Sequence, residues 1–127
     1  MILDTTTWDH YENVDKCLQH GGILPEPKSR EENEFLSGLG YDTLYIFLGM
    51  NARETDGTWV WNSDSTPVVY QNWYPNYDNR DMAINCALMT VDDYYWYNTP
   101  CNHQPGLWGV DIKLICQKAE GWYFSLF

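Results

Sequence analysis

The chain has 127 residues, with seven Lys or Arg against eighteen Asp or Glu and a net charge of −11. Its length suits one domain, 1–127, that buries about two-thirds of its unfolded surface. The acidic residues are dispersed, which disfavours nucleic acid and anionic membranes as partners, because binding them relies on a basic patch. No run of about 18 apolar residues occurs, so no membrane span is predicted.

The four cysteines lie at positions 17, 86, 101 and 116. None stands in C-x-x-C spacing, which disfavours zinc-ribbon and thioredoxin-like sites and favours a disulfide framework made in an oxidising compartment. We therefore expect a secreted protein. The N-terminus lacks a charged segment followed by an apolar one, so any signal peptide is expected to have been removed. The spacing alone leaves three cysteine pairings open.

A first helix is predicted from Asp9, because Glu12 stands three residues later and completes a capping box. Four apolar residues recur at helical spacing on the face expected to meet the core: Tyr11, Val14, Cys17 and Leu18. Gly21 and Gly22 can adopt the positive φ angles that end such a helix. Residues 23–25 follow as a brief strand, which the nearby prolines keep short.

A second helix is predicted from Ser29, with Glu32 at the reciprocal capping position. Its apolar stripe consists of Phe35, Leu36 and Leu39. Gly38 and Gly40 are expected to end it.

The middle of the chain reads as short strands. Residues 44–50 form a short apolar run bounded by turn residues, which favours a buried strand over a helix. A hairpin turn at 55–57 leads into an alternating strand at 58–61, and 67–70 indicates another short strand.

Residues 74–83 are rich in Asn, Asp and aromatic residues without periodicity, which is typical of a loop. Strands are expected in three later segments: 86–91, 94–97 and 112–117. Residues 102–109 form an insert with Pro and Gly. The apolar tail 121–127 is expected either to pair as a strand with the N-terminus or to contact another chain, which leaves a homodimer open.

Catalytic motifs are absent from the sequence. The three histidines, at positions 10, 20 and 103, do not stand in metal-ligand spacing. There is no nucleophile elbow, phosphate loop or H-E-x-x-H string. Asp92 and Asp93 read as a turn, because adjacent residues on a strand would point to opposite faces. The sequence therefore predicts neither an enzyme nor a cofactor.

A series of motifs runs in order through residues 9–118: Cys17-x-x-x-Gly21-Gly22-x-Leu24, Ser29 to Leu36, Phe47-Leu-Gly-Met50, Trp59-Val-Trp61-Asn-Ser-Asp64, Asn72-Trp73, Asn85-Cys86, Trp96-Tyr-Asn98, Pro100-Cys101 and Leu114-Ile-Cys116-Gln-Lys118. This series resembles the short form of the C-type lectin-like domain. The resemblance implies an α+β fold, with two helices flanking antiparallel β-sheets and a long irregular loop region. It also implies two disulfides, Cys17 with Cys116 and Cys86 with Cys101.

The same resemblance assigns the tryptophans. Four of them fall within the family motifs and are expected to pack in the core: Trp59, Trp61, Trp73 and Trp96. Trp108 and Trp122 lie outside the motifs and are better candidates for exposure.

In this family, sugar binding usually runs through a bound calcium ion, which prefers about six to eight oxygen ligands. The family's calcium-ligand positions fall here on Tyr77, Asp78, Asn79, Ile84, Tyr97 and Asn98. Ile84 offers no oxygen, Tyr97 replaces an amide, and Asn98 replaces a carboxylate. We therefore expect no metal cofactor. A secondary calcium site near Asp56, Asp78 and Asp81 is also disfavoured, because loop acids more often fix turns.

The loop surface can bind a ligand without metal. Its candidate ligand-binding residues are Tyr77, Asp78, Asn79, Asp81, Tyr95, Tyr97 and Asn98. Aromatic faces beside amide and carboxylate groups suit sugar rings, and the same composition occurs in protein-binding loops. For any one tyrosine, packing that holds the loop in shape is an equal alternative. The sequence predicts a calcium-independent module for a glycan or glycoprotein, with a protein ligand as the alternative; a calcium-dependent lectin and an ice- or mineral-binding protein are less favoured.

Overall fold

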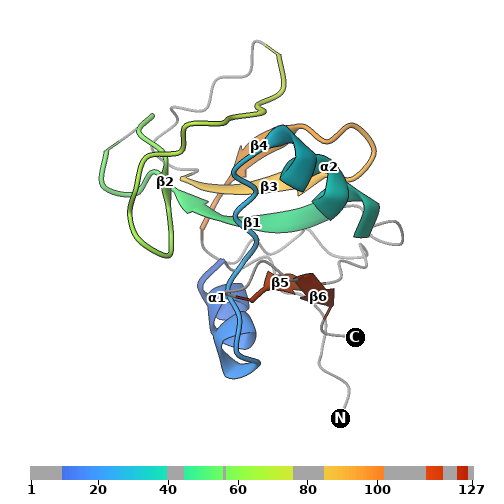
Figure 1. The fold of residues 1–127 in the computed structure, drawn as a ribbon. Coiled ribbons are helices and arrows are strands. Elements are labelled where there is room, and N and C mark those ends of the chain that lie inside the picture. The colour runs from blue at the N-terminus through green and yellow to red at the C-terminus, as the bar shows by residue number, and fades with distance from the viewer. Residues whose placement is uncertain are drawn as a thin grey trace.

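The structure is a computed structural model, and it describes residues 10–39, 45–55, 57–75, 85–101, 114–118 and 123–125. Along these ranges the elements are α1 (His10–Gln19), α2 (Arg30–Leu39), β1 (Tyr45–Asn51), β2 (Val60–Trp61), β3 (Cys86–Thr90), β4 (Trp96–Thr99), β5 (Ile115–Gln117) and β6 (Tyr123–Ser125). A four-stranded antiparallel sheet has the order β2-β1-β3-β4, and β5 pairs with β6. α1 and the β5–β6 pair lie below this sheet in Figure 1, and α2 lies beside its upper part.

The register of the central sheet shifts at Gly49. β1 pairs with β3 in regular register as far as Leu48, and the next pair joins Asn51 to Cys86. Gly49 N–H donates to the carbonyl of Pro25 over 2.8 Å, so the chain before α2 passes directly against β1. A Cβ atom at this position would lie 2.7 Å from the carbonyl oxygen of Leu24. The close approach therefore requires glycine at position 49.

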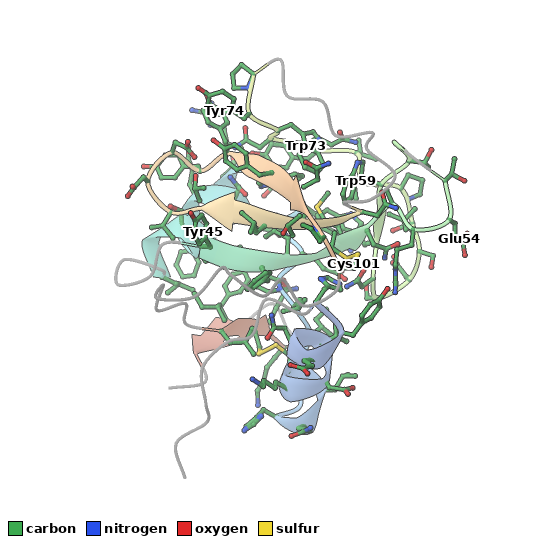
Figure 2. All side chains as sticks on the ribbon, turned by 180° about the vertical axis from the view of Figure 1, so that it is seen from behind. Tyr45, Glu54, Trp59, Trp73, Tyr74 and Cys101 are labelled. Atoms are coloured by element: carbon green, nitrogen blue, oxygen red, sulfur yellow. A yellow bond between two sulfur atoms is a disulfide. The ribbon has the colours of Figure 1, made fainter. Side chains whose placement is uncertain are left out.

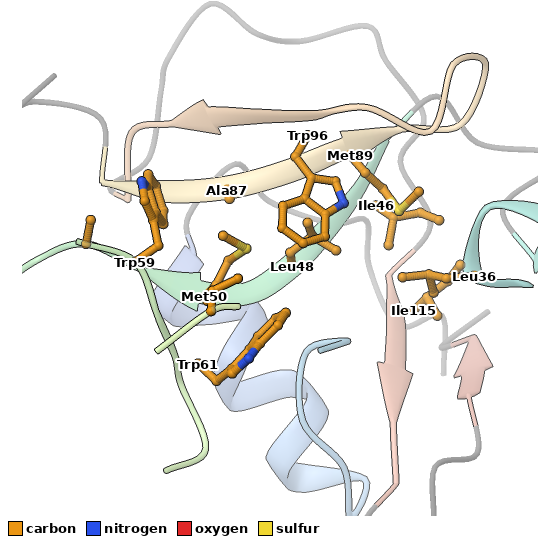
Figure 3. Close-up of a cluster of buried hydrophobic side chains, with 12 residues drawn as sticks. Leu36, Ile46, Leu48, Met50, Trp59, Trp61, Ala87, Met89, Trp96 and Ile115 are labelled. Atoms are coloured by element: carbon orange, nitrogen blue, oxygen red, sulfur yellow. The ribbon is translucent and has the colours of Figure 1, made fainter. Parts of the chain in front are cut away.

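Both faces of the sheet are buried, because alternate residues of β1 and β3 point to opposite sides. One face carries Ile46, Leu48, Met50, Ala87 and Met89, and Figure 3 shows them with three buried tryptophans, Trp59, Trp61 and Trp96. The other face packs Phe47 and Leu88 against Leu24, Leu114 and the Cys17–Cys116 disulfide. Core packing is confirmed for those three tryptophans, while Trp73 is half-buried against them. Trp108 and Trp122 lie outside the described residues.

α1 forms where it was expected, and its predicted apolar face is confirmed in part: Cys17 is buried and Val14 packs against the core, while Tyr11 and Leu18 are exposed. Its buried residues are His10, Asn13 and Cys17. Leu18 is 57% exposed. The inner face accommodates polar groups because they find partners there: the ring nitrogen Nε2 of His10 lies 3.0 Å from the amide nitrogen of Asn62.

At the end of α1, the expected positive φ is confirmed for Gly21 and not for Gly22. Gly21 has φ of +80°. Gly22 N–H donates to the Cys17 carbonyl over 2.8 Å, and Gly21 N–H donates to the Leu18 carbonyl over 3.1 Å. These are the two hydrogen bonds of a Schellman motif. The expected capping box at Asp9 lies outside the described residues.

α2 also buries a more polar face than expected. Leu36 is buried, but its buried neighbours are Asn33 and Ser37. Phe35 is 61% exposed, and Leu39 is exposed as well. Ser37 Oγ donates to the Val91 carbonyl over 3.0 Å, so hydrogen bonds to the β3–β4 hairpin replace part of the expected apolar contact.

Capping of α2 by Ser29 is confirmed with one difference. Glu32 N–H donates to Ser29 Oγ over 3.1 Å. The Glu32 carboxylate accepts from the N–H of Lys28 over 2.7 Å, one residue before the expected donor. α2 extends to Leu39, so Gly38 lies within it, and Gly40 lies outside the described residues.

Both expected disulfides are present, Cys17 with Cys116 and Cys86 with Cys101. The expected strand at 67–70 is reduced to one bridge between Val60 and Pro67. The brief strand at 23–25 is likewise a single bridge, from Ile23 to Gln117. β6 pairs with β5, so the tail contributes a strand to its own C-terminal segment.

No helix within the described ranges is long and apolar enough to cross a membrane.

Candidate functional site

The candidate site is built around the β3–β4 hairpin. Tyr94 adopts a positive φ of 66°, and its N–H donates to the Thr90 carbonyl over 3.0 Å. The Asp93 carboxylate holds the turn from inside: Oδ1 accepts from the N–H of Tyr95 over 2.9 Å and from the hydroxyl of Thr90. The acid pair at 92–93 is therefore a turn, as the sequence indicates.

The segment 72–74 runs along the outer edge of β4. Trp96 N–H donates to the Asn72 carbonyl over 2.8 Å, and Tyr74 N–H donates to the Trp96 carbonyl over 3.2 Å. A parallel bridge joins Trp73 to Trp96. Trp73 turns inward against Trp59, with 4.8 Å between ring centroids, so the following residue, Tyr74, is directed outward. Figure 2 shows Tyr74 at the opposite end of the molecule from α1.

Three rings gather beside this edge, and we call Tyr74, Tyr95 and Tyr97 the tyrosine face. The rings of Tyr74 and Tyr97 are stacked, with 5.5 Å between centroids and 28° between planes. Tyr95 meets Tyr74 edge-on at 5.3 Å. Tyr97 Oη donates to Asp93 Oδ2 over 3.1 Å, which fixes its orientation. Tyr74 is 45% exposed and covers the stack on the outer side.

The tyrosine face offers flat apolar surfaces with hydroxyl groups at their edges and one carboxylate behind them. Such rings bind an apolar face of a ligand, and the hydroxyl and carboxylate oxygens orient its polar groups. A sugar ring, which has CH groups on one side and hydroxyls around its rim, has matching chemistry.

The structure brings together only some of the predicted ligand-binding residues. Tyr95 and Tyr97 belong to the tyrosine face. Asn98 follows Tyr97 on β4 and therefore points to the opposite face of the sheet, on the side of Trp96. It is only 7% exposed. The other four predicted residues lie outside the described ranges: Tyr77, Asp78, Asn79 and Asp81.

Two contributors were missing from the predicted set, Tyr74 and Asp93. The signal for Tyr74 was available, because the Asn72-Trp73 motif places a tryptophan inward and so directs its neighbour outward. Asp93 could be identified as a turn residue, but its contact with Tyr97 depends on the turn conformation.

Two of the family's calcium-ligand positions, Tyr97 and Asn98, lie within the described residues. Both Oδ1 and Nδ2 of Asn98 are buried without a hydrogen-bond partner. Tyr97, at a ligand position of the family, directs its phenol to Asp93. Across the described ranges, no group of three or more His, Cys, Asp or Glu is placed to hold a metal ion.

Several known proteins are similar to this chain. Pulmonary surfactant-associated protein D of Bos taurus is 33% identical over 89 residues, which are 69% of this chain and 24% of that protein. Mannose-binding protein of Gallus gallus is 26% identical over 101 residues, covering 80% of this chain and 37% of that protein. The chain thus spans well under half the length of these relatives.

Solved structures agree on the fold. A calcium-independent type II antifreeze protein superimposes with a TM-score of 0.64 at 30% identity, covering 77% of this chain and 72% of that one. The carbohydrate-recognition domain of the mouse scavenger receptor C-type lectin gives a TM-score of 0.68 at 21% identity, covering 80% and 76%. The family model of the Lectin C-type domain matches residues 5–107. Since that match covers most of the sequence, the chain belongs to the Lectin C-type domain family.

Proposed function

We propose that the chain is a secreted, non-enzymatic recognition module, one domain over residues 1–127, that binds carbohydrate without calcium. The observation that supports this proposal is the stack of Tyr74 on Tyr97, exposed on its outer side and backed by the Asp93 carboxylate. The names of two relatives, mannose-binding protein and C-type mannose receptor 2, support a glycan as the ligand class. The two disulfides support secretion.

Independence from calcium rests on the composition of the family's ligand positions. Ile84 carries no oxygen, and the phenol of Tyr97 is a poor substitute for an amide. Binding is then supplied by ring stacking and hydrogen bonds. Four residues lie shortly after Tyr74 in the sequence, and we propose that they complete the site: Tyr77, Asp78, Asn79 and Asp81.

The first experiment is a glycan array probed with the purified protein, once with calcium and once with a chelator. Binding that survives the chelator is the expected result. Binding that disappears with the chelator would refute the calcium-independent site. Absence of binding in both conditions would favour a protein ligand instead of a glycan.

The site is located by a matched pair of variants. Tyr74→Ala is expected to weaken glycan binding at least about tenfold, because it removes the outer ring of the stack. Tyr11→Ala is the control, since Tyr11 on α1 is similarly exposed, 44% against 45%, and is not part of the tyrosine face. Equal loss in both variants would point to a general change in the protein and not to the tyrosine face.

Two further variants test the loop. Tyr77→Ala and Asn79→Ala are expected to weaken binding while the melting temperature stays nearly unchanged. Normal binding by both would place the ligand contacts elsewhere.

Ice binding is the second candidate, favoured by the similarity to the calcium-independent type II antifreeze protein at 30% identity. Measurable thermal hysteresis that Tyr74→Ala leaves intact would support ice binding at another surface.

A homodimer through the tail 121–127 is also proposed, and the molecular mass in solution tests it.

A further inference from the structure

A second hollow lies next to the tyrosine face, between α2 and the β3–β4 hairpin. It has a volume of about 350 Å³ and is lined by Arg30 and Glu34 of α2, by Tyr70, and by Asp93, Tyr94 and Tyr95 of the hairpin. The tyrosine face and this cavity meet at the hairpin, because Tyr95 also contacts Tyr74 and Asp93 also accepts from Tyr97.

Two amides in the cavity wall donate to the hairpin. Asn33 Nδ2 donates to the Tyr94 carbonyl over 3.1 Å, and Asn72 Nδ2 donates to the same carbonyl over 2.8 Å. The remaining oxygen of Asn33 accepts from the indole of Trp96 over 2.7 Å. These amides hold the strained hairpin in place, and the charged acceptors that line the cavity are the carboxylates of Glu34 and Asp93.

The charges of the wall favour a cation. Glu34 and Asp93 carry two negative charges against the one positive charge of Arg30, in a chain whose net charge is −11. The rings of Tyr70, Tyr94 and Tyr95 add π faces, which attract an ammonium group within about 6 Å.

We propose that this cavity binds a protonated primary amine, carried by a lysine side chain or by an amino sugar. The ammonium group would donate to the carboxylate of Glu34 and lie against the tyrosine rings. The proposal is independent of glycan binding at the tyrosine face.

Arg30 competes with the ligand for the carboxylate of Glu34. Its Nε lies 3.1 Å from Glu34 Oε1, and both side chains are largely exposed. An exposed ion pair of this kind is weak, so an incoming ammonium group can displace the guanidinium. Removing the positive charge of Arg30 should therefore strengthen cation binding, since it frees Glu34 and removes a like charge.

The test is a titration of the whole chain, followed by NMR at Tyr70 and Tyr94, which line the cavity and are not part of the tyrosine face. The probes are Nα-acetyl-lysine methylamide and glucosamine as amines, N-acetylglucosamine as the neutral analogue and glucuronate as the anion. At least one of the two amines should shift these resonances, with a dissociation constant in the millimolar range. The neutral and anionic probes should cause no shift. Binding of acetyl-lysine alone assigns the amine to a protein, and binding of glucosamine alone assigns it to a glycan.

Three charge variants of α2 decide the mechanism. Glu34→Gln should weaken amine binding by about three- to tenfold, and Arg30→Gln should strengthen it by about two- to threefold. Glu31→Gln is the matched control, since it removes the same charge from an exposed position of α2 that does not line the cavity. Near-UV circular dichroism confirms that each variant is folded.

Three results would overturn the proposal. The first is the absence of amine-induced shifts at the cavity. The second is equal weakening by Glu31→Gln and Glu34→Gln, which would show only a general field effect. The third is glucuronate binding that Arg30→Gln abolishes, which would make the cavity an anion site.

Discussion

The indole Nε1–H of Trp96 donates to the amide oxygen of Asn33 over 2.7 Å, and this buried hydrogen bond joins β4 to α2. The other end of the Asn33 amide donates to the carbonyl of Tyr94. One asparagine thus connects the core tryptophan to the hairpin that carries the candidate site.

Trp96→Phe is expected to destabilise the protein by about 3 kcal/mol. The variant leaves the buried Asn33 oxygen without a donor and also opens a small cavity. Trp73→Phe is the control, because its indole donates to Gln71 Oε1 at an exposed position and its loss should cost less than about 1.5 kcal/mol. Urea denaturation measures both, and equal losses would show that the buried hydrogen bond contributes nothing special.

Glycine substitutions should have opposite effects at two positions. Gly49→Ala places a Cβ atom 2.7 Å from the backbone oxygen of Leu24, which can move only if the main chain shifts. We therefore expect the free energy of unfolding to fall by about 2–4 kcal/mol. At Gly38, on the exposed side of α2, a Cβ meets nothing within 4 Å. Gly38→Ala should therefore stabilise the helix by about 0.5–1 kcal/mol. Thermal unfolding measures both variants, and a Gly49→Ala protein as stable as the parent would contradict the close approach.

The two disulfides should contribute unequally to stability. Cys17 and Cys116 are 99 residues apart in sequence, and Cys86 and Cys101 are 15 apart. In the chain-entropy model these separations correspond to about 4–5 and about 3 kcal/mol. Replacing each pair by alanine and measuring the free energy of unfolding tests the order. A larger loss from the short bridge would mean that local packing outweighs chain entropy.

Glu26 should make the protein less stable as the pH rises. Its side chain is buried, and burial raises the pKa of its carboxyl, although hydrogen bonds from Ser63 oppose the shift. The folded state therefore holds this proton more tightly than the unfolded state. The corresponding stability is present below the unfolded pKa of about 4.3 and is lost as pH rises through the higher folded value.

Comparing Glu26→Gln with the parent isolates this effect. The parent should lose stability relative to the variant across that pH window, measured by denaturant unfolding from about pH 4 to pH 7. A relative gain in the parent would mean that the Ser63 hydrogen bonds outweigh burial.

Sequence patterns located the helices, but only part of the faces they bury, through Cys17 and Leu36. In α1 and α2, apolar residues such as Leu18 and Phe35 are exposed while Asn13 and Asn33 are buried. The periodicity of apolar residues cannot predict the burial of a polar side chain whose hydrogen-bond partner lies far away in the sequence. Asn33 shows this directly, since its partner Trp96 is 63 residues away.

The candidate site was predictable only in part, because one of its contacts joins residues far apart in the sequence. Tyr95 and Tyr97 share a side because they are two residues apart near one strand. Asn98 was grouped with them by the family motif, although strand alternation directs it to the opposite face. Tyr74 joins them only because its main chain pairs with Trp96, which is a long-range contact.

The Cys17–Cys116 bridge has a consequence for proteolysis. Any single cut between these two residues leaves both pieces joined by a covalent bond. A nick in the segment 76–84, which follows Tyr74 in the sequence, would add one water to the mass and would release no fragment until the sulfurs were reduced. The protein can thus be cleaved once within its predicted binding loop and still persist as one molecule in an oxidising environment.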